Sequence, residues 1–166
     1  MGGAGKDDLQ MHQTLLAEII REAAEPHAQR GVTIETKISD GHNGGIDEPY
    51  IIRRPEIVHG LRNMIQNAVD FATSKVWVES SWTKESITIT ISDDGYGYPP
   101  SLLGRLGDPF LGAKIGKENR QGYEGMGLGL FIAKTLLERT GAKISFSNGD
   151  RNQTSAHSKR EASGAI

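Results

Sequence analysis

The sequence contains no cysteine among its 166 residues. Disulfide bonds, zinc sites with thiolate ligands and cysteine nucleophiles are therefore excluded within the chain. No apolar run approaches the ~20 residues that a membrane-spanning helix needs, and the N-terminus lacks a signal-peptide pattern. Charges of the two signs are nearly balanced, with 19 Lys and Arg residues and 21 Asp and Glu residues. A net charge of −2 provides no basic field for nucleic acid or a membrane surface.

The remaining composition fits one ordinary cytoplasmic domain that is long enough to bury a core. We expect residues 1–7 to be a disordered tag remnant, because the chain begins Met-Gly-Gly-Ala-Gly. The domain itself should span residues 8–148. We expect residues 149–166 to form a polar tail that is truncated before or within a last strand.

Apolar residues recur at helical spacing in three segments, which predicts main helices over residues 8–29, 55–72 and 127–140. Pro55 falls in the first turn of its helix, where proline is tolerated, and Gly141 is typical of a residue just after a helix. Pro26 should bend or end the first helix, because proline cannot donate the backbone hydrogen bond.

Alternating apolar and polar residues predict half-buried strands over residues 32–38, 75–82, 86–92 and 143–147, with a short strand at 50–52. The strands 75–82 and 86–92 form the clearest hairpin. Residues 41–45 are glycine-rich and are predicted to form a loop. Residues 95–125 show no periodicity, and a loop of this length in a compact domain is usually functional or disordered.

Asn63 and Asn67 lie four residues apart on the predicted helix 55–72, so their side chains share a face. The amide oxygen of asparagine suits Mg²⁺, which takes few protein ligands and keeps phosphates and waters. The alternative is that both are polar residues on a solvated face. They lie beside Met64 and Ile65 rather than among charges, which fits that alternative poorly.

Asp93, Gly95 and Gly97 follow directly after the strand at 86–92. Asp-Gly usually marks a hairpin turn, but no strand follows it here. A carboxylate at a strand end, with glycines that leave room for a flat ring, can accept a hydrogen bond from an exocyclic amine such as adenine N6. Asp93 is the candidate for this contact.

A third glycine-rich segment, Gly125-Met126-Gly127-Leu128-Gly129, leads into the helix at 127–140. Glycine lets the backbone approach a ligand closely, and a helix start presents N–H groups and a positive dipole end to an anion. The segment therefore fits a phosphate site. By itself it fits a glycine-rich turn before a core helix at least as well.

Four motifs occur in a fixed order: Asn63-x-x-x-Asn67, Asp93-x-Gly95-x-Gly97, Pro109-Phe110 and Gly125-x-Gly127-x-Gly129. They resemble the N, G1, F and G2 boxes of sensor histidine kinase ATP-binding domains in the gyrase/Hsp90/histidine kinase/MutL (GHKL) superfamily. The resemblance covers roughly residues 8–148, and segments 63–72, 103–110 and 123–141 look like the RegB/PrrB/ActS redox-responsive kinases. It implies the Bergerat fold, a two-layer α/β sandwich with a mixed β-sheet on three main helices and an ATP lid over residues 98–124.

The resemblance also implies a set of nucleotide-binding residues: Asn63, Asn67, Asp70, Phe71, Asp93, Gly95, Gly97, Phe110, Lys114, Gly125, Met126, Gly127, Leu128 and Gly129. Asn67 would bind Mg²⁺ and Asn63 would lie near the phosphates. Phe71 would lie beside the nucleotide, although a plain core role is an equal alternative. Phe110 would anchor the lid, and the lid cations Lys114, Lys117 and Arg120 could approach the γ-phosphate.

Asp70 departs from the family pattern, in which Lys or Arg commonly stands three residues after the second asparagine. A carboxylate repels a nearby triphosphate unless it faces a cation. We therefore expect Asp70 to face a cation, to turn outward, or to act on the metal through water.

ATP-hydrolysing relatives carry glutamate at the position of Asn63, where it acts as a general base. An amide cannot accept a proton, whereas a histidine acceptor has a free lone pair and needs no strong base. Asn63 therefore favours phosphoryl transfer to histidine, which depends mostly on positioning and charge neutralisation. A Hsp90/MutL-like ATPase and a non-catalytic nucleotide-binding module remain the alternatives.

None of the five histidines lies in the His-Glu/Asp context of a phosphoacceptor, and His12, which is followed by Gln13, does not match it. The chain should therefore bind ATP without phosphorylating itself. Its expected partners are the dimerisation and phosphoacceptor domain of the kinase and, indirectly, a response regulator. We expect the family's last strand to begin at Gly164 and to leave a weakened sheet edge.

Overall fold

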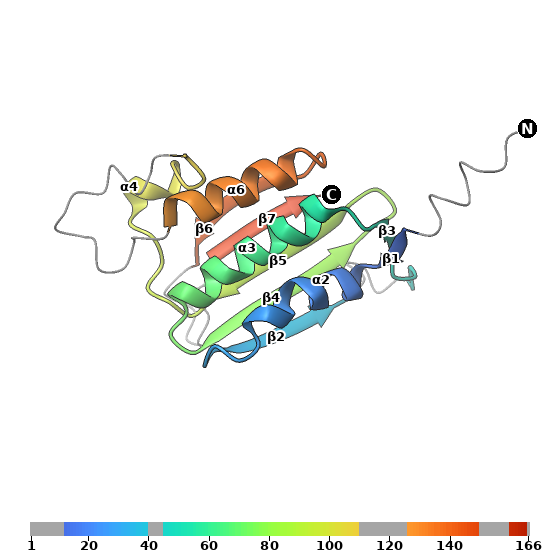
Figure 1. Cartoon of the computed structure of the whole chain (residues 1–166), viewed down its shortest axis with the longest axis horizontal. Helices are drawn as coiled ribbons and strands as arrows, with labels where there is room; N and C mark the ends of the chain where they lie inside the picture. The colour runs from blue at the N-terminus through green and yellow to red at the C-terminus, as the bar shows by residue number, and fades with distance from the viewer. Residues whose placement is uncertain (1–11, 40–44, 110–125, 150–159, 166) are drawn as a thin grey trace, which may run out of the picture.

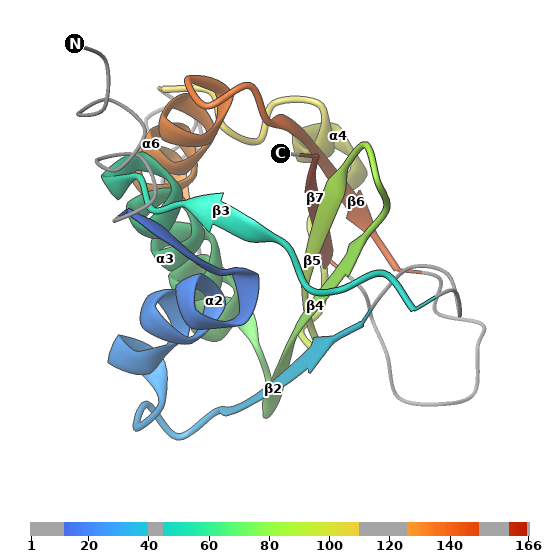
Figure 2. The same cartoon turned by 90° about the vertical axis from the view of Figure 1, so that its right-hand side faces the viewer.

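The computed structural model describes residues 12–39, 45–109, 126–149 and 160–165. They form two layers, with a five-stranded sheet on one side and three helices on the other: α2 Leu16–Ala24, α3 Pro55–Phe71 and α6 Met126–Glu138 (Figures 1 and 2). The predicted two-layer α/β sandwich is confirmed. None of the described helices is long and apolar enough to cross a membrane.

The strand order of the main sheet is β2-β4-β5-β7-β6, with β2 parallel to β4 and the other neighbours antiparallel. The strand bounds are β2 Thr33–Ile38, β4 Lys75–Trp82, β5 Ile87–Asp93, β6 Lys143–Asn148 and β7 Arg160–Ala165. The predicted hairpin is the β4–β5 pair. Its isoleucines at 87, 89 and 91 are buried while the threonines between them are partly exposed, because alternate residues point to opposite faces.

The C-terminal strand corrects the expectation for the tail. β7 begins at Arg160, not at Gly164, and it lies inside the sheet between β5 and β6 rather than at an edge. Its sequence, Arg-Glu-Ala-Ser-Gly-Ala, lacks the β-branched and aromatic residues that mark strands. The strand forms because the backbone N–H and C=O groups of β5 and β6 need hydrogen-bond partners. This requirement cannot be seen in the composition of residues 160–165.

The predicted first helix is also too long at both ends. Residues 13–15 form strand β1, Gln13–Leu15, which pairs antiparallel with β3, Tyr50–Ile52, in a separate small sheet. The helix α2 spans only Leu16–Ala24 and passes into a 3-10 turn, η1, Glu25–His27. Strand pairing overrides helix periodicity at the start, and Pro26 ends the α-helix as predicted because it lacks a donor.

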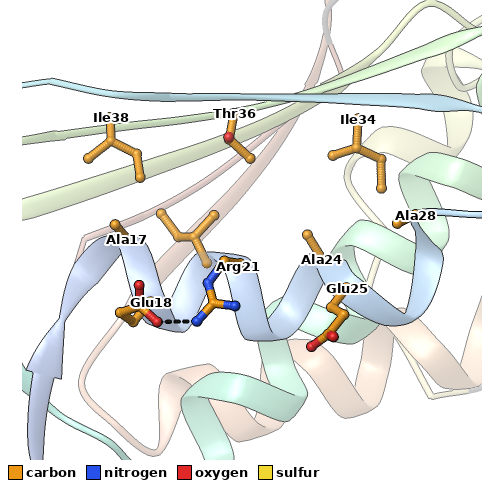
Figure 3. A pocket seen from close by; sticks show the side chains of 10 residues that line it. Ala17, Glu18, Arg21, Ala24, Glu25, Ala28, Ile34, Thr36 and Ile38 are labelled. Atoms are coloured by element: carbon orange, nitrogen blue, oxygen red, sulfur yellow. Dashed lines mark hydrogen bonds and ion pairs between the residues drawn. The ribbon is translucent and has the colours of Figure 1, made fainter.

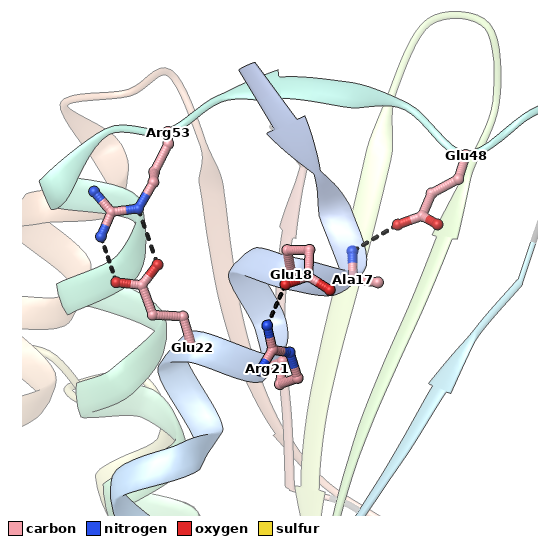
Figure 4. Close-up of polar contacts among 6 residues, drawn as sticks. All are labelled: Ala17, Glu18, Arg21, Glu22, Glu48 and Arg53. Atoms are coloured by element: carbon pink, nitrogen blue, oxygen red, sulfur yellow. Dashed lines mark hydrogen bonds and ion pairs between the residues drawn. The ribbon is translucent and has the colours of Figure 1, made fainter. Parts of the chain in front are cut away.

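Polar contacts fasten α2 to the chain on both sides of β3 (Figure 4). Glu48 accepts the N–H of Ala17 at 2.6 Å, which satisfies one of the backbone donors at the helix start. Arg53 donates two hydrogen bonds to the carboxylate of Glu22, one of them from Nε at 2.9 Å. These hydrogen bonds lower the pKa of Glu22 below its ordinary value, against the opposing effect of burial.

The central helix α3, Pro55–Phe71, begins at Pro55 as predicted and lies between α2 and α6, Met126–Glu138. Its buried residues are Ile57, Val58, Gly60, Leu61, Met64, Ile65, Ala68 and Val69. At Gly60 a Cβ would lie 2.5 Å from Leu137 Cγ of α6, so any larger residue would overpack against this side chain at the present approach of the two helices. Because these buried residues hold one face of α3 in the core, they also fix the orientation of its opposite, polar face.

Candidate nucleotide-binding site

The polar face of α3 carries the two asparagines at the border of the core. Asn63 and Asn67 are partly exposed, while the adjacent Met64 and Ile65 are buried. Asn67 Nδ2 donates to the hydroxyl oxygen of Tyr98 at 2.7 Å. This contact uses the amide nitrogen, so the amide oxygen, which is the atom that a Mg²⁺ ion would take, is not the atom engaged by Tyr98.

The end of β5 places a buried carboxylate against the C-terminal end of α3. Asp93 is fully buried, and its Oδ1 accepts the N–H of Gly95 at 2.8 Å. A Cβ on Gly95 would lie 2.1 Å from the backbone oxygen of Phe71 and 2.7 Å from Asp93 Oδ1. Only glycine can fit this space, so the sequence-predicted residues Asp93, Gly95 and Phe71 are in direct proximity.

A clamp that the sequence did not predict holds the next segment. Asn148, at the end of β6, accepts the N–H of Tyr98 through Oδ1 at 2.8 Å and donates from Nδ2 to the Tyr98 carbonyl at 2.6 Å. Gly97 has φ +76°, and a Cβ there would lie 2.9 Å from Asn148 Oδ1. The clamp therefore explains why the chain needs glycine immediately before Tyr98.

The ring of Tyr98 is buried and joins the candidate site residues together. Its centroid lies 5.7 Å from that of Phe71, with the two rings tilted by 50°. Its hydroxyl meets Asn67, so one side chain links the aromatic residue near the end of α3 to the asparagine face. In the sequence Tyr98 was only the first residue of the expected lid. An aromatic residue directly after the Asp-x-Gly-x-Gly motif was the available signal.

Asp94 is a second residue that the sequence reasoning missed, and its role is structural. Its carboxylate accepts backbone N–H groups from Thr73, Ser74 and Lys75 at 2.8, 2.9 and 3.1 Å. Burial acts to raise the pKa of Asp94, but these contacts and the Ser74 hydroxyl outweigh burial and lower it. Asp94 thereby fastens the end of β5 to the chain between α3 and β4, directly beside Asp93.

Asp70 faces a cation in the structure. Arg30 Nη2 donates to Asp70 Oδ1 at 2.7 Å, and both side chains are partly exposed. Arg30 comes from the turn between η1 and β2, a segment that the sequence reasoning did not connect with the site.

Part of the glycine-rich segment is described as the first turn of α6. Leu128 is 62% exposed, and among the described residues a Cβ on Gly129 would meet nothing within 4 Å. Figure 1 shows α6 beginning at the end of the molecule where α3 ends. Only the backbone of Met126 and Gly127 is described, and the other predicted residues of this region, Phe110, Lys114, Lys117, Arg120 and Gly125, lie outside the described residues.

A groove of about 560 Å³ lies elsewhere, between α2 and the edge strand β2 (Figure 3). Its apolar lining includes Ala24 from the helix and Ile34 and Ile38 from the strand, and the ion-paired Glu18 and Arg21 also line it. None of its lining residues belongs to the set that the sequence predicted for nucleotide binding.

Comparison with known proteins agrees with this architecture. A family model described as "Histidine kinase-, DNA gyrase B-, and HSP90-like ATPase" matches residues 53–162. The chain is 56% identical to the sensor histidine kinase RegB of Cereibacter sphaeroides over 169 residues, covering 100% of this chain and 37% of RegB. It is 30% identical to the histidine protein kinase SaeS of Staphylococcus aureus, covering 80% of this chain and 38% of SaeS.

Two solved structures show the same fold. The mycobacterial sensor histidine kinase MprB has a TM-score of 0.66 at 18% identity, covering 92% of this chain and 93% of that one. Full-length ShkA in complex with AMPPNP has a TM-score of 0.67 at 19% identity, covering 93% of this chain and 30% of that one.

The chain therefore belongs to the family of histidine kinase-, DNA gyrase B- and HSP90-like ATPases. Its sequence relatives in this family are sensor histidine kinases, and the chain is the ATP-binding catalytic domain of a RegB-like sensor kinase. The resemblance identified from the four motifs is confirmed. The chain spans somewhat more than a third of the length of RegB.

Proposed function

We propose that this chain binds Mg²⁺-ATP and transfers the γ-phosphoryl group to a histidine on a separate dimerisation and phosphoacceptor domain. A response regulator would then receive the phosphoryl group. The observation that carries this proposal is the joining of the buried Asp93 carboxylate to the asparagine face of α3 through Gly95, Phe71 and Tyr98. A buried acceptor and a face of neutral amide ligands are the two features that an adenine and a metal-bound triphosphate require.

The described residues fit the adenine end of the nucleotide. Asp93 would accept a hydrogen bond from adenine N6, and the glycines at 95 and 97 let the backbone beside it pack closely against Phe71 and Asn148, where any side chain would clash. Phe71 would lie beside the base, where its contact with Tyr98 fixes the ring.

The described residues also fit a magnesium ion at the triphosphate end. Mg²⁺ would neutralise charge on the transferred phosphoryl group. Asn67 would bind the ion through its amide oxygen, and Asn63, one helical turn earlier, would position the phosphates. Neither amide can take a proton, so these residues contribute positioning rather than base catalysis. The glycine-rich segment from Gly125 to Gly129 would line the triphosphate, and Phe110 and Lys114 would serve the lid.

Hydrolysis by a Hsp90/MutL-like mechanism is the second candidate function. It would need a base able to activate water, and Asn63 stands at the position where such relatives carry glutamate. The amide there supports transfer to histidine. We further propose that the domain acts on the cytoplasmic side and that it belongs to a redox-responsive kinase, on the basis of its similarity to RegB.

A labelling experiment tests the transfer step. The chain is mixed with a separately produced phosphoacceptor hairpin and with ATP labelled at the γ-phosphate. We expect label on the acceptor histidine and none on this chain. ATP that is bound without labelling the hairpin would contradict the kinase proposal, and steady release of phosphate without the hairpin would favour the ATPase.

Asp93→Asn tests the adenine contact. Asparagine keeps the Oδ1 acceptor that Gly95 uses but places an NH₂ donor where the second carboxylate oxygen would meet adenine N6. We expect calorimetry to detect no ATP binding, while the thermal unfolding transition stays close to that of the wild type. The exposed Asp47→Asn is the matched control and should bind normally. Unchanged affinity in Asp93→Asn would refute the contact.

A further inference from the structure

The asparagine face of α3 continues into an ion pair with another part of the chain. Asp70 lies seven residues after Asn63 and three after Asn67, so the three side chains share one face of the helix. Arg30 Nη2 lies 2.7 Å from Asp70 Oδ1. The guanidinium of Arg30 is therefore brought to the face that carries the proposed metal and phosphate residues.

The fold fixes the backbone from which Arg30 reaches α3. The turn after α2 contacts α3 through η1. Within this turn the N–H of Ala28 donates to the Glu25 carbonyl at 3.2 Å, and the N–H of Arg30 donates to the His27 carbonyl at 3.3 Å. Gly31 follows with φ +80°, which reverses the chain into β2. Arg30 thus lies in a structured turn.

The ion pair itself contributes little to stability, because its two side chains are 42% and 39% exposed. The ion pair matters more for the local charge, because Arg30 neutralises the carboxylate of Asp70. An unpaired carboxylate at position 70 would repel a triphosphate, and Arg30 cancels that repulsion. The described contact with Asp70 uses one of the five N–H donors of the guanidinium, whose planar fork can bind a second oxyanion.

Arg30 also acts electrostatically beyond its contact with Asp70. Its charge and that of Arg62 both act on the nearby His27, and the charge of Arg62 also acts on Glu22 of α2. On the face of α3 that carries Asn63, Asn67 and Asp70, the positive charge is therefore supplied by Arg30. A phosphate chain that runs along α3 from Asn67 would meet that charge.

We propose that Arg30 contacts the phosphates of the bound nucleotide and that Asp70 is the positioning residue that holds its guanidinium beside α3. This inference rests on the proposed function, because it takes Asn63 and Asn67 as the phosphate and metal residues. It adds a binding residue from outside the four motifs, supplied by the turn between η1 and β2. The recognised chemistry is the phosphate oxyanion, not the adenine or the ribose.

Arg30→Ala is the deciding variant, tested by calorimetry on the whole chain with Mg²⁺-ATP and with adenosine, which has no phosphate. The affinity for ATP should fall about tenfold, the loss expected for one charge-assisted contact, while the affinity for adenosine stays unchanged. Arg30→Lys should recover part of the loss, since it keeps the charge without the fork. Unchanged ATP affinity, or an equal loss for both ligands, would overturn the proposal.

Asp70→Asn tests the positioning role and should weaken ATP binding less than Arg30→Ala does. Binding as tight as in the wild type, or tighter, would overturn that role. Arg21→Ala is the matched control, because Arg21 also pairs with a carboxylate but lies on α2 beside the groove. If Asp93→Asn abolishes binding while Arg30→Ala does nothing, only this inference fails. A wild-type chain that binds no ATP would overturn both proposals.

Discussion

The two adjacent carboxylates at the end of β5 have different surroundings and therefore different functions. Asp93 is fully buried and contacts the backbone of Gly95 two residues later. Asp94 receives the backbone N–H of Ser74, which lies between α3 and β4, and that of Lys75, the first residue of β4. Because Asp94 fastens the backbone immediately after Asp93, we assign it to placing the adenine acceptor rather than to contacting the ligand.

His27 predicts a pH dependence of stability at the residue scale. Its side chain is buried in η1; desolvation lowers its pKa, and the nearby Arg30 and Arg62 lower it further, against the opposing charge of Asp70. The unfolded chain therefore binds the proton first as the pH falls through about 6.5. The free energy of unfolding should be constant above that pH and should decrease below it.

Urea unfolding of the wild type and of His27→Gln between pH 7.5 and about pH 5 measures this effect. The variant should lose the decrease that the wild type shows over this interval. His59→Gln, on the exposed face of α3, is the control and should keep it. Asp94 does not interfere, because its lowered pKa confines its effect to pH values below the ordinary 3.8. Parallel curves for the wild type and His27→Gln would contradict the prediction.

Single residues of the site were predictable where they belong to a short motif. Asp93 and Gly95 lie two residues apart, so their spacing is visible in the sequence. The contacts of Tyr98 with Asn148 and of Arg30 with Asp70 join residues 50 and 40 positions apart. One sequence carries no signal for such distant pairs, because each partner taken alone is an ordinary surface or strand-end residue.

The packing of α3 on α6 gives a test at the scale of elements, through two helical glycines. A Cβ on Gly60 would lie 2.5 Å from Leu137, whereas a Cβ on Gly129 would meet no atom of the part of the chain that the structure describes within 4 Å. Gly129→Ala should raise the free energy of unfolding by about 1 kcal/mol, because alanine favours helix. Gly60→Ala gains the same helix preference but overpacks the interface at a cost of about 1–3 kcal/mol, so it should be neutral or destabilising.

Urea midpoints of the two glycine variants provide the measurement. Adding Leu137→Ala to Gly60→Ala should cost less than the sum of the two single changes, because the smaller side chain relieves the clash. Equal stabilisation by alanine at both glycines would show that the helices can separate freely.

Helices and strands with a strong hydrophobic periodicity were predicted most accurately. The helix α3 and the β4–β5 hairpin carry strong periodicity, and the structure has them within one residue of the predicted bounds. The short helix α4, Pro100–Leu103, was missed because four residues cannot show a period. Strand β1 was missed, and β7 was expected to begin only at Gly164, because each depends on a distant partner: β3 for the first, and β5 and β6 for the second.

At the scale of the whole molecule, β7 closes the sheet. It pairs with β5 on one side and with β6 on the other, and β7 is the partner recorded for β6 among the described strands. Deleting residues 160–166 should therefore leave β6 without its ladder and expose the edge of β5. We expect a lower thermal transition that is also less cooperative, followed by circular dichroism. Deleting Ile166 alone keeps all six residues of β7 and is the control; equal transitions for both deletions would contradict the prediction.

The same strand order determines when the sheet can form while the chain is being synthesised. Translation produces β6 before β7, so β6 emerges from the ribosome while its partner strand is still unmade. A nascent chain stalled before residue 160 can form the β4–β5 hairpin and its helices, but it cannot complete the sheet. Folding must then finish after nearly the whole domain has been released, which leaves a period when unpaired strand edges are open to other chains.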